Sequence, residues 1–358
     1  MKIYQLGWGM LILLTLFSCA KEGNNTISSS RDKAFGPISK VYVVSDQDLW
    51  ESPLRDTFKY YFQSAYPVLP QAEPMYDLKH FTGEALMLRK ERRTLRAYVL
   101  LADLSNPESP VTKILAKDMG KEKIEQTIRD KSYAINVGRN KWVDDQIIVY
   151  IGGYGADMIE KAIAENFNVI NKKIRDLEDK KIGSIVYMGG VNAKLQSKLK
   201  SEYGIGLKIP AEYFLALEDK KTQTIWMRKE TEKSSNNIMI RKLKYDSKER
   251  FSKEGIKAIR DSLGIYVHSD IPNSFMVTND VDLPMIIENM PLNDNYAMEA
   301  RGIWELENDY MGGPFVGYLV HNPMSNELIY VDGFIHAPGV NKRGLMLQLE
   351  LILSSLSL

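Results

Sequence analysis

Residues 296–307 read Tyr-Ala-Met-Glu-Ala-Arg-Gly-Ile-Trp-Glu-Leu-Glu, and this stretch decides the fold class of the second half of the chain. Small or apolar residues from Met298 to Leu306 alternate with Glu299, Arg301 and Glu305. A period of two is typical of a β-strand that has one buried and one exposed face. Such strands belong mostly to antiparallel sheets, so the stretch predicts an antiparallel sheet.

Residues 155–178 have a different period. Their apolar side chains recur every three or four positions, which predicts a long helix that packs against a core. Shorter amphipathic patterns predict further helices over 110–130 and 252–264. Together these patterns favour an α+β fold with mixed strands and helices over a β-α-β series.

The two halves of the chain also show similar patterns in the same order. Pro70 is followed by Arg-Lys-Glu at 89–91, and Pro210 is followed by Arg-Lys-Glu at 228–230, with nearly equal offsets. We therefore expect two similar tandem domains, 37–181 and 182–358, the second a duplication of the first. Each is expected to be an antiparallel sheet with helices packed on one face. Residues 182–192 fit either a strand or the tail of the long helix.

Composition excludes several classes of protein. The chain has 358 residues, Lys+Arg 47 against Asp+Glu 46, and 44% hydrophobic residues. This balance argues against nucleic-acid binding and against intrinsic disorder. One cysteine cannot form an internal disulfide, and four scattered histidines lack metal-binding spacing, so neither a cofactor nor a metal site is expected.

The N-terminus predicts a membrane anchor. An apolar stretch over 6–17 is too short to span a bilayer comfortably, and Leu16-Phe17-Ser18-Cys19 follows the pattern of a bacterial lipobox. The sequence therefore predicts a signal peptide over 1–18, acylation of Cys19 with palmitate-type chains, and a flexible tether over 19–36. Ala20 favours the outer membrane by analogy with enteric bacteria. A secretory signal with an incidental cysteine is the alternative.

Four carboxylates of the second half are candidates for catalysis: Glu299, Glu305, Glu307 and Asp309. Side chains two positions apart on a strand are roughly 7 Å apart, a spacing that glycoside hydrolysis tolerates. The competing interpretation is an exposed face whose acids pair with Arg301, because any half-exposed strand shows alternating charges. Hydrolysis of envelope glycan or peptide by these residues therefore stays an alternative.

Two further clusters allow an anion site. The glycine-rich stretch 152–155 precedes the long helix, but Asp157 stands where a phosphate-binding loop has its Lys-Ser/Thr ending, so a tight turn is the simpler interpretation. A basic cluster around an expected hairpin tip suits either solvent or the phosphates of a membrane surface or an acidic glycan. Its members are Arg89, Lys90, Arg92, Arg93 and Arg96.

Several motifs resemble those of a known family. They are Ile209-Pro210-x-x-Tyr213, the run 226–231, the segment 301–315, and the ending around Ala337-Pro338 and Asn341-Lys342-Arg343. This chain resembles a family of uncharacterised Bacteroidetes envelope lipoproteins, catalogued only as a domain of unknown function. The resemblance implies lipidation and an envelope location, and it implies no activity or catalytic residue.

These observations predict a lipid-anchored protein of the cell envelope that binds a partner or ligand without catalysis. The membrane, through the N-terminal lipid, is the expected partner, together with an envelope protein or glycan. An accessory subunit of an outer-membrane complex is the other alternative, and it would need a large apolar patch on one domain.

Overall fold

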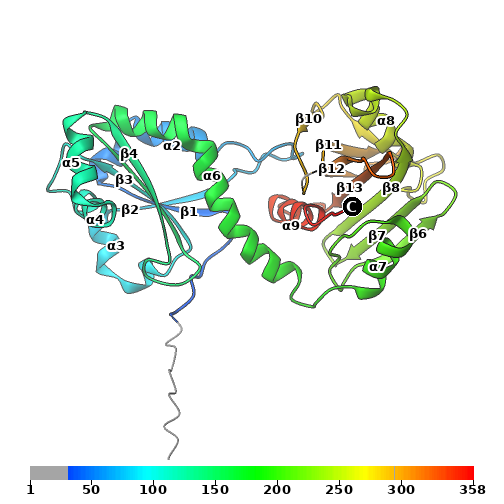
Figure 1. The fold of residues 1–358 in the computed structure, drawn as a ribbon, viewed down its shortest axis with the longest axis horizontal. Coiled ribbons are helices and arrows are strands. Elements are labelled where there is room, and N and C mark those ends of the chain that lie inside the picture. The colour runs from blue at the N-terminus through cyan, green and yellow to red at the C-terminus, as the bar shows by residue number, and fades with distance from the viewer. Residues whose placement is uncertain (1–30, 294) are drawn as a thin grey trace, which may run out of the picture.

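The computed structural model describes residues 31–293 and 295–358. The predicted signal peptide, Cys19 and the first part of the predicted tether lie outside these residues. Two α+β domains follow one another along the chain, and the long helix α6 (Ala156–Val186) leads from the first to the second (Figure 1). The prediction of an α+β protein with two tandem domains is confirmed.

The elements of the first domain are β1 (Lys40–Val44), α1 (Gln47–Glu51), α2 (Leu54–Phe62), β2 (Asp77–Phe81), α3 (Gly83–Leu88), η1 (Lys90–Arg93), β3 (Ala97–Asp103), α4 (Pro110–Met119), α5 (Lys121–Arg129), β4 (Tyr133–Arg139), β5 (Ile147–Gly153) and α6. The elements of the second domain are α7 (Ala193–Lys198), η2 (Leu199–Tyr203), β6 (Phe214–Asp219), β7 (Thr224–Glu230), β8 (Ser235–Lys244), η3 (Lys248–Phe251), α8 (Lys253–Gly264), β9 (Met276–Asn279), β10 (Ile286–Asn289), β11 (Ala297–Leu306), β12 (Gly312–Asn322), β13 (Glu327–His336) and α9 (Arg343–Leu353).

The sheet of the first domain is mixed, with the strand order β2-β1-β3-β5-β4. Strand β1 pairs in parallel with β2 and β3, β3 pairs in parallel with β5, and β4 pairs antiparallel with β5. The expected antiparallel sheet is therefore wrong for this domain, as is the preference against a β-α-β series. Helices connect its parallel strands, and β3 and β5 are uninterrupted apolar runs, as strands buried on both faces usually are.

Helices cover both faces of this first sheet. Helices α2 and α6 pack on one face, and α3, α4 and α5 pack on the other. The expectation of helices on one face is therefore wrong here. The alternation of inward and outward side chains on β1, β3 and β5 supplies apolar groups to both layers.

The sheet of the second domain is antiparallel, as predicted, with the order β10-β11-β12-β13-β8-β7-β6 and with β9 also paired to β11. Helices α7 and α9 pack on one face and α8 packs on the other. Here, too, helices on both faces replace the expected single layer. Strand β11 is consequently not half-exposed: Glu299 on it is buried, and Trp304 packs in the core beneath α8.

The two domains are not copies of one fold. Their strand orders and pairing directions differ, so the expected duplication is wrong. The Arg-Lys-Glu run at 89–91 follows helix α3, whose first turn is capped by Thr82 through the amide of Ala85 at 3.2 Å. The run at 228–230 lies in strand β7. The same three residues are compatible with either structure because polar surface residues have weak conformational preferences.

The predicted domain boundary between 181 and 182 falls inside α6, so residues 182–186 are helical. The expected tether also ends earlier than residue 36. Phe35 forms a β-bridge with Leu95, Lys33 forms one with Asp144, and Ala34 is buried. Residues 31–36 therefore belong to the first domain.

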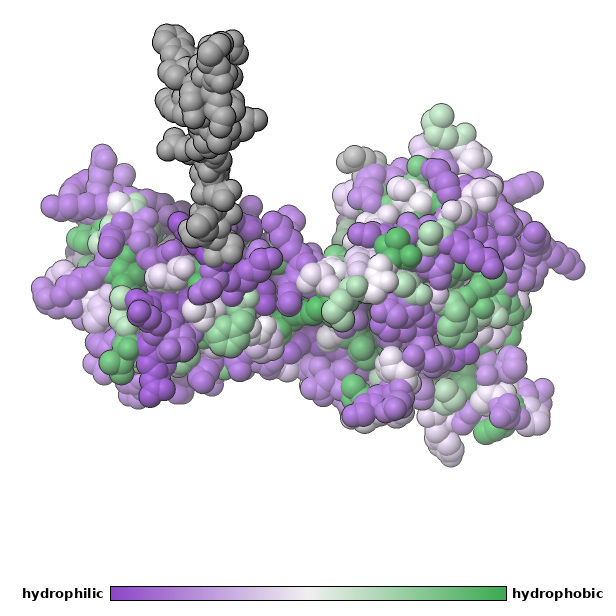
Figure 2. Space-filling view, turned by 90° about the horizontal axis from the view of Figure 1, so that it is seen from below, coloured by the Kyte–Doolittle hydropathy of each residue, from purple (hydrophilic) through white to green (hydrophobic). Residues whose placement is uncertain are grey.

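A crossing segment, residues 63–76, joins the first domain to the core of the second. Figure 1 shows it as the light-blue chain after α2 that reaches the region of α9 and β10. Tyr66 and Leu69 are buried in the core cluster beneath α9. Glu73 accepts hydrogen bonds from the backbone amide of Lys342 at 2.5 Å and from that of Arg343 at 3.3 Å, at the start of α9. The crossing segment thus connects the two domains where the molecule is narrowest, between two largely hydrophilic lobes (Figure 2).

Candidate functional site

A cleft between the two domains is the main candidate site. Its volume is about 340 Å³, and both domains contribute its walls. The lining residues are Tyr66, Pro67 and Met75 of the crossing segment, Asn171 and Arg175 of α6, Ile286 and Glu288 of β10, Glu299 and Arg301 of β11, and Glu350 of α9. Ligand sites occur preferentially at domain interfaces, where two surfaces meet in a concave shape.

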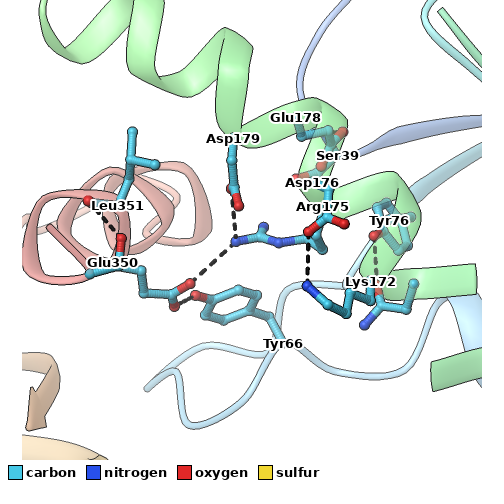
Figure 3. Close-up of polar contacts among 12 residues, drawn as sticks. Ser39, Tyr66, Tyr76, Lys172, Arg175, Asp176, Glu178, Asp179, Glu350 and Leu351 are labelled. Atoms are coloured by element: carbon cyan, nitrogen blue, oxygen red, sulfur yellow. Dashed lines mark hydrogen bonds and ion pairs between the residues drawn. The ribbon is translucent and has the colours of Figure 1, made fainter. Parts of the chain in front are cut away.

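Glu350 is the centre of the polar network in this cleft (Figure 3). Its Oε1 accepts a hydrogen bond from Arg301 Nη1 at 2.6 Å and another from the hydroxyl of Tyr66. Its Oε2 accepts one from Arg175 Nη2 at 3.3 Å, and Arg175 also faces Asp179 at 3.8 Å. The carboxyl group of α9 thus binds side chains from the crossing segment, α6 and β11.

Burial raises the pKa of Glu350 above its ordinary value. Its three neighbours are donors, and two of them are guanidinium groups, which favour the ionised carboxylate. The geometry therefore fits a carboxylate that is desolvated and compensated by arginines. Such a group fixes the relative position of the domains more than it supplies a free acid or base.

Glu299, the first of the predicted catalytic carboxylates, lies in the same cleft but is already paired. Its oxygens accept hydrogen bonds from Arg301 Nε at 2.5 Å and Nη2 at 3.0 Å, in a bidentate arrangement. The hydroxyl of Tyr318 donates to Glu299 Oε2 at 2.8 Å. The Glu–Arg pairing considered from the sequence is therefore present, although it is buried and does not form an exposed face.

The rest of the cleft has a different chemistry. Pro67, Met75 and Ile286 form an apolar wall, and Ile286 is 45% exposed. Glu288 on the exposed strand β10 has no ion-pair partner among residues 31–293 and 295–358. A ligand with an apolar body and a cationic group would match both features.

Two other predicted carboxylates line a second cavity of about 510 Å³, which lies at the end of β11, the start of β12 and the end of β13. Glu305 accepts a hydrogen bond from Asn279 Nδ2 at 2.9 Å, and Asp309 lies in the turn after β11. His336 lines the same cavity, and its Nδ1 lies 3.4 Å from the carbonyl oxygen of Gly312. The structure thus separates Glu299 from Glu305 and Asp309, and Glu307 is exposed outside both cavities.

The glycine-rich stretch before α6 has a structural role. The amide of Gly155 donates to Asp103 Oδ1 at 2.9 Å, so a carboxylate already occupies the turn before α6. In the second domain, Asp332 binds Arg260 in the core. Among the described residues, no group of three or more His, Cys, Asp or Glu is placed to hold a metal ion. Within the same residues, no helix is both long and apolar enough to span a bilayer.

Sequence reasoning missed Glu350, Arg175 and Tyr66. One signal was available for Glu350, which is the single acidic residue in the otherwise largely apolar helix Arg343–Leu353. A charged side chain on an apolar helix is rarely buried without partners, so it predicts a polar contact. Arg175 and Tyr66 carry no comparable signal, because their contacts depend on the packing of the two domains.

Comparisons with known proteins agree with the division into two domains. Residues 34–186 match a family described as Domain of unknown function (DUF8532), and residues 192–355 match one described as Domain of unknown function (DUF4837). Both halves match domains of unknown function. The predicted resemblance to a family catalogued only as a domain of unknown function is therefore confirmed. That the family belongs to Bacteroidetes and consists of lipoproteins stays a prediction.

Solved structures give only distant similarity. A 1.9 Å crystal structure of the Saccharomyces cerevisiae Ran-binding protein Mog1p matches with 9% identity and a TM-score of 0.29, covering 44% of this chain and 92% of that one. A point mutant of Mog1 matches with 9% identity and a TM-score of 0.27, covering 43% and 89%. Comparison with curated proteins gives no match.

Proposed function

We propose that this protein is a lipid-anchored component of the cell envelope that binds a small ligand in the cleft between its domains. The carrying observation is the cleft itself, because five separate segments from both domains contribute side chains to it. Its charged groups are largely paired with one another, which suits recognition and positioning better than proton transfer. The apolar wall and Glu288 favour a small amphipathic ligand with an amine or other cationic group.

A cleft-filling variant tests the binding function. Ile286→Trp adds bulk to the wall without removing a polar contact of Glu350, and Val169→Trp adds the same bulk on α6 at a position that is 61% exposed. Native mass spectrometry of protein isolated gently from its envelope should show a bound small molecule in the wild type and in Val169→Trp. The Ile286→Trp variant should lose at least about nine-tenths of it. Equal occupancy in all three proteins would refute the cleft as the site.

The anchor requires a separate test. Lipidation of Cys19 would place the protein on a membrane, because several acyl chains together give stable attachment. Ala20, directly after the lipidated residue, favours the outer membrane. Wild-type protein should incorporate labelled palmitate and remain with the membrane fraction, whereas Cys19→Ala should do neither. Membrane retention of Cys19→Ala at the wild-type level would count against the anchor and would leave the cleft untouched.

Hydrolysis of envelope glycan or peptide is the second candidate, because Glu305, Asp309 and His336 line one cavity. If that cavity is catalytic, Glu305→Gln combined with Asp309→Asn should lower product release from purified envelope material at least about 100-fold. Glu307→Gln, an exposed neighbour, is the matched control. Unchanged release in the double variant would exclude these carboxylates.

A further inference from the structure

A basic pocket in the first domain lies apart from both cavities described above. Its volume is about 340 Å³, and it is bounded by the N-terminal segment, the start of β3, the loop before β5 and the C-terminal half of α6. The lining residues are Lys33, Ala34, Arg96, Asp145, Leu177, Lys180, Lys181 and Ser184. Four of these side chains are basic, and Asp145 is the acidic one among the described residues that line the pocket.

Arg96 is the buried part of this site. Only 4% of it is exposed, and no carboxylate of the described residues lies within ion-pair distance of it. Its Nη2 approaches the carbonyl oxygens of Ala34 and Gly36, each at 3.4 Å, and its buried Nε has no acceptor within the described part of the chain. Burying a guanidinium in this way is costly unless a counter-charge compensates it.

Glu178 is a buried acid whose charge interacts with that of Arg96, and it compensates Arg96 only in part. Glu178 Oε1 accepts a hydrogen bond from the amide of Ser39 at 2.6 Å, and its Oε2 has no partner among the described residues. Burial also raises the pKa of Glu178 to about 7, so this group carries less than a full charge near neutral pH. The positive charge of Arg96 at the wall of the pocket therefore lacks a full counter-charge from the described residues.

We propose that this pocket binds a phosphate group. Lys33, Lys180 and Lys181 are exposed beside Arg96, so the site presents four positive charges against the one of Asp145. A doubly charged oxyanion suits such a site, and arginine forms strong, directional hydrogen bonds to phosphate oxygens. The pocket has the size of an ordinary ligand site, so the phosphate is expected to belong to a larger molecule.

Two sources of phosphate fit this chemistry: the headgroup of an anionic phospholipid and a soluble phosphorylated compound. Lys33 lies in the segment 31–36, which leads toward the N-terminus, where we propose the lipid anchor. An extended chain reaches about 3.5 Å per residue, so residues 19–33 could place the pocket near a membrane surface. The site itself does not depend on the anchor or on the cleft between the domains.

Two pairs of lysines on the same helix test the proposal. Lys180→Gln with Lys181→Gln removes two charges of the pocket, and Lys172→Gln with Lys173→Gln removes two exposed charges two turns earlier on α6. Because the test relies on exposed residues, it does not require a variant at the buried Arg96. Titration calorimetry would use the mature chain with Cys19→Ser and inorganic phosphate, with chloride at matched ionic strength as the blank.

Phosphate should bind the wild-type chain, and the 180/181 variant should weaken binding at least about tenfold, since each nearby lysine contributes roughly tenfold or somewhat less. The 172/173 variant should change it by less than about twofold. Equal weakening by both pairs would overturn the proposal. Absence of phosphate binding above the chloride blank would also overturn it if the lipid described next fails to bind.

The source is identified with dihexanoyl phosphatidylglycerol, used below the concentration at which it forms micelles. Binding at least about tenfold tighter than inorganic phosphate, and lost in the 180/181 variant, would assign the site to a phospholipid headgroup. Binding no tighter than inorganic phosphate would assign it to a soluble phosphorylated compound. Failure of both probes to bind refutes the phosphate site, and neither result bears on the ligand of the interdomain cleft.

Discussion

The core of the second domain and the edge of the first domain both bury an arginine, and they compensate its charge differently. Arg260 is a completely buried residue of α8, and its Nε lies 3.3 Å from Asp332 Oδ1 and its Nη1 lies 3.1 Å from Thr278 Oγ1. Its guanidinium carbon lies 3.6 Å from the ring centroid of Phe315. Arg96 has two long contacts with carbonyl oxygens and faces a pocket.

This difference separates a structural arginine from one that is available to a ligand. The charge of Arg260 is compensated by groups of its own domain, so its removal leaves the buried carboxyl of Asp332 with the hydroxyl of Tyr330 but without a counter-charge. The charge of Arg96 has no such partner within the described residues, so its removal leaves no orphaned carboxylate in direct contact. Replacing Arg260 should therefore lower the stability of the protein strongly, whereas replacing Arg96 should lower it only slightly.

The largest effect is expected for Arg260→Met. It should lower the free energy of unfolding by about 3–5 kcal/mol, because the ionised form of Asp332 would remain buried without its guanidinium. Urea denaturation followed by circular dichroism measures the change. Adding Asp332→Leu to the variant should restore much of the loss, and a double variant as unstable as the single one would show that the ion pair is not the cause.

Glu178, the buried acid near Arg96, should make the stability of the protein depend on pH. Its pKa rises from the ordinary value of 4.5 to about 7, so the folded protein retains a proton that the unfolded chain releases between these values. The free energy of unfolding should then fall as the pH rises from about 4.5 to about 7, by about 3 kcal/mol relative to Glu178→Gln. Urea denaturation of both proteins from pH 4 to 8 tests this. Parallel stability curves would contradict it.

Replacing Glu350 should have an effect on stability between those of replacing Arg260 and Arg96. The partners of Glu350 come from both domains, so its loss weakens the contact between them. Glu350→Gln keeps an acceptor for Tyr66 but removes the charge that faces Arg175 and Arg301. The free energy of unfolding should fall by about 2 kcal/mol. Glu307→Gln, an exposed acid, should change it by less than about 0.5 kcal/mol. Similar stabilities for the two variants would show that the interdomain network contributes little.

The smallest effect on stability is expected for Arg96→Met, which keeps most of the buried side-chain volume. Its free energy of unfolding should fall by about 1 kcal/mol, since only weak hydrogen bonds are lost. Phosphate should raise the unfolding temperature of the wild type but not that of Arg96→Met. A loss as large as that of Arg260→Met would mean that Arg96 has a structural role.

The sequence predicted local structure better than it predicted arrangement. Period 3.6 located α6 and α8, and period 2 located β11, because these patterns follow from which face of one element is apolar. The same alternation suggested that one face of β11 is exposed. Glu299 and Arg301 are instead covered by the packing of α9 and α6, and residues 175 and 350 cannot be paired with them from local spacing.

The sequence by itself determined the α+β class, the two-domain division, the near-neutral charge and the acidic strand that contains Glu299 and Glu305. Only the tertiary structure decided that these two carboxylates line different cavities and that Arg96 faces a basic pocket. The reason is physical. Periodicity reports which face of an element is apolar, whereas burial and compensation of a charge depend on segments that are far away in sequence and adjacent only after folding.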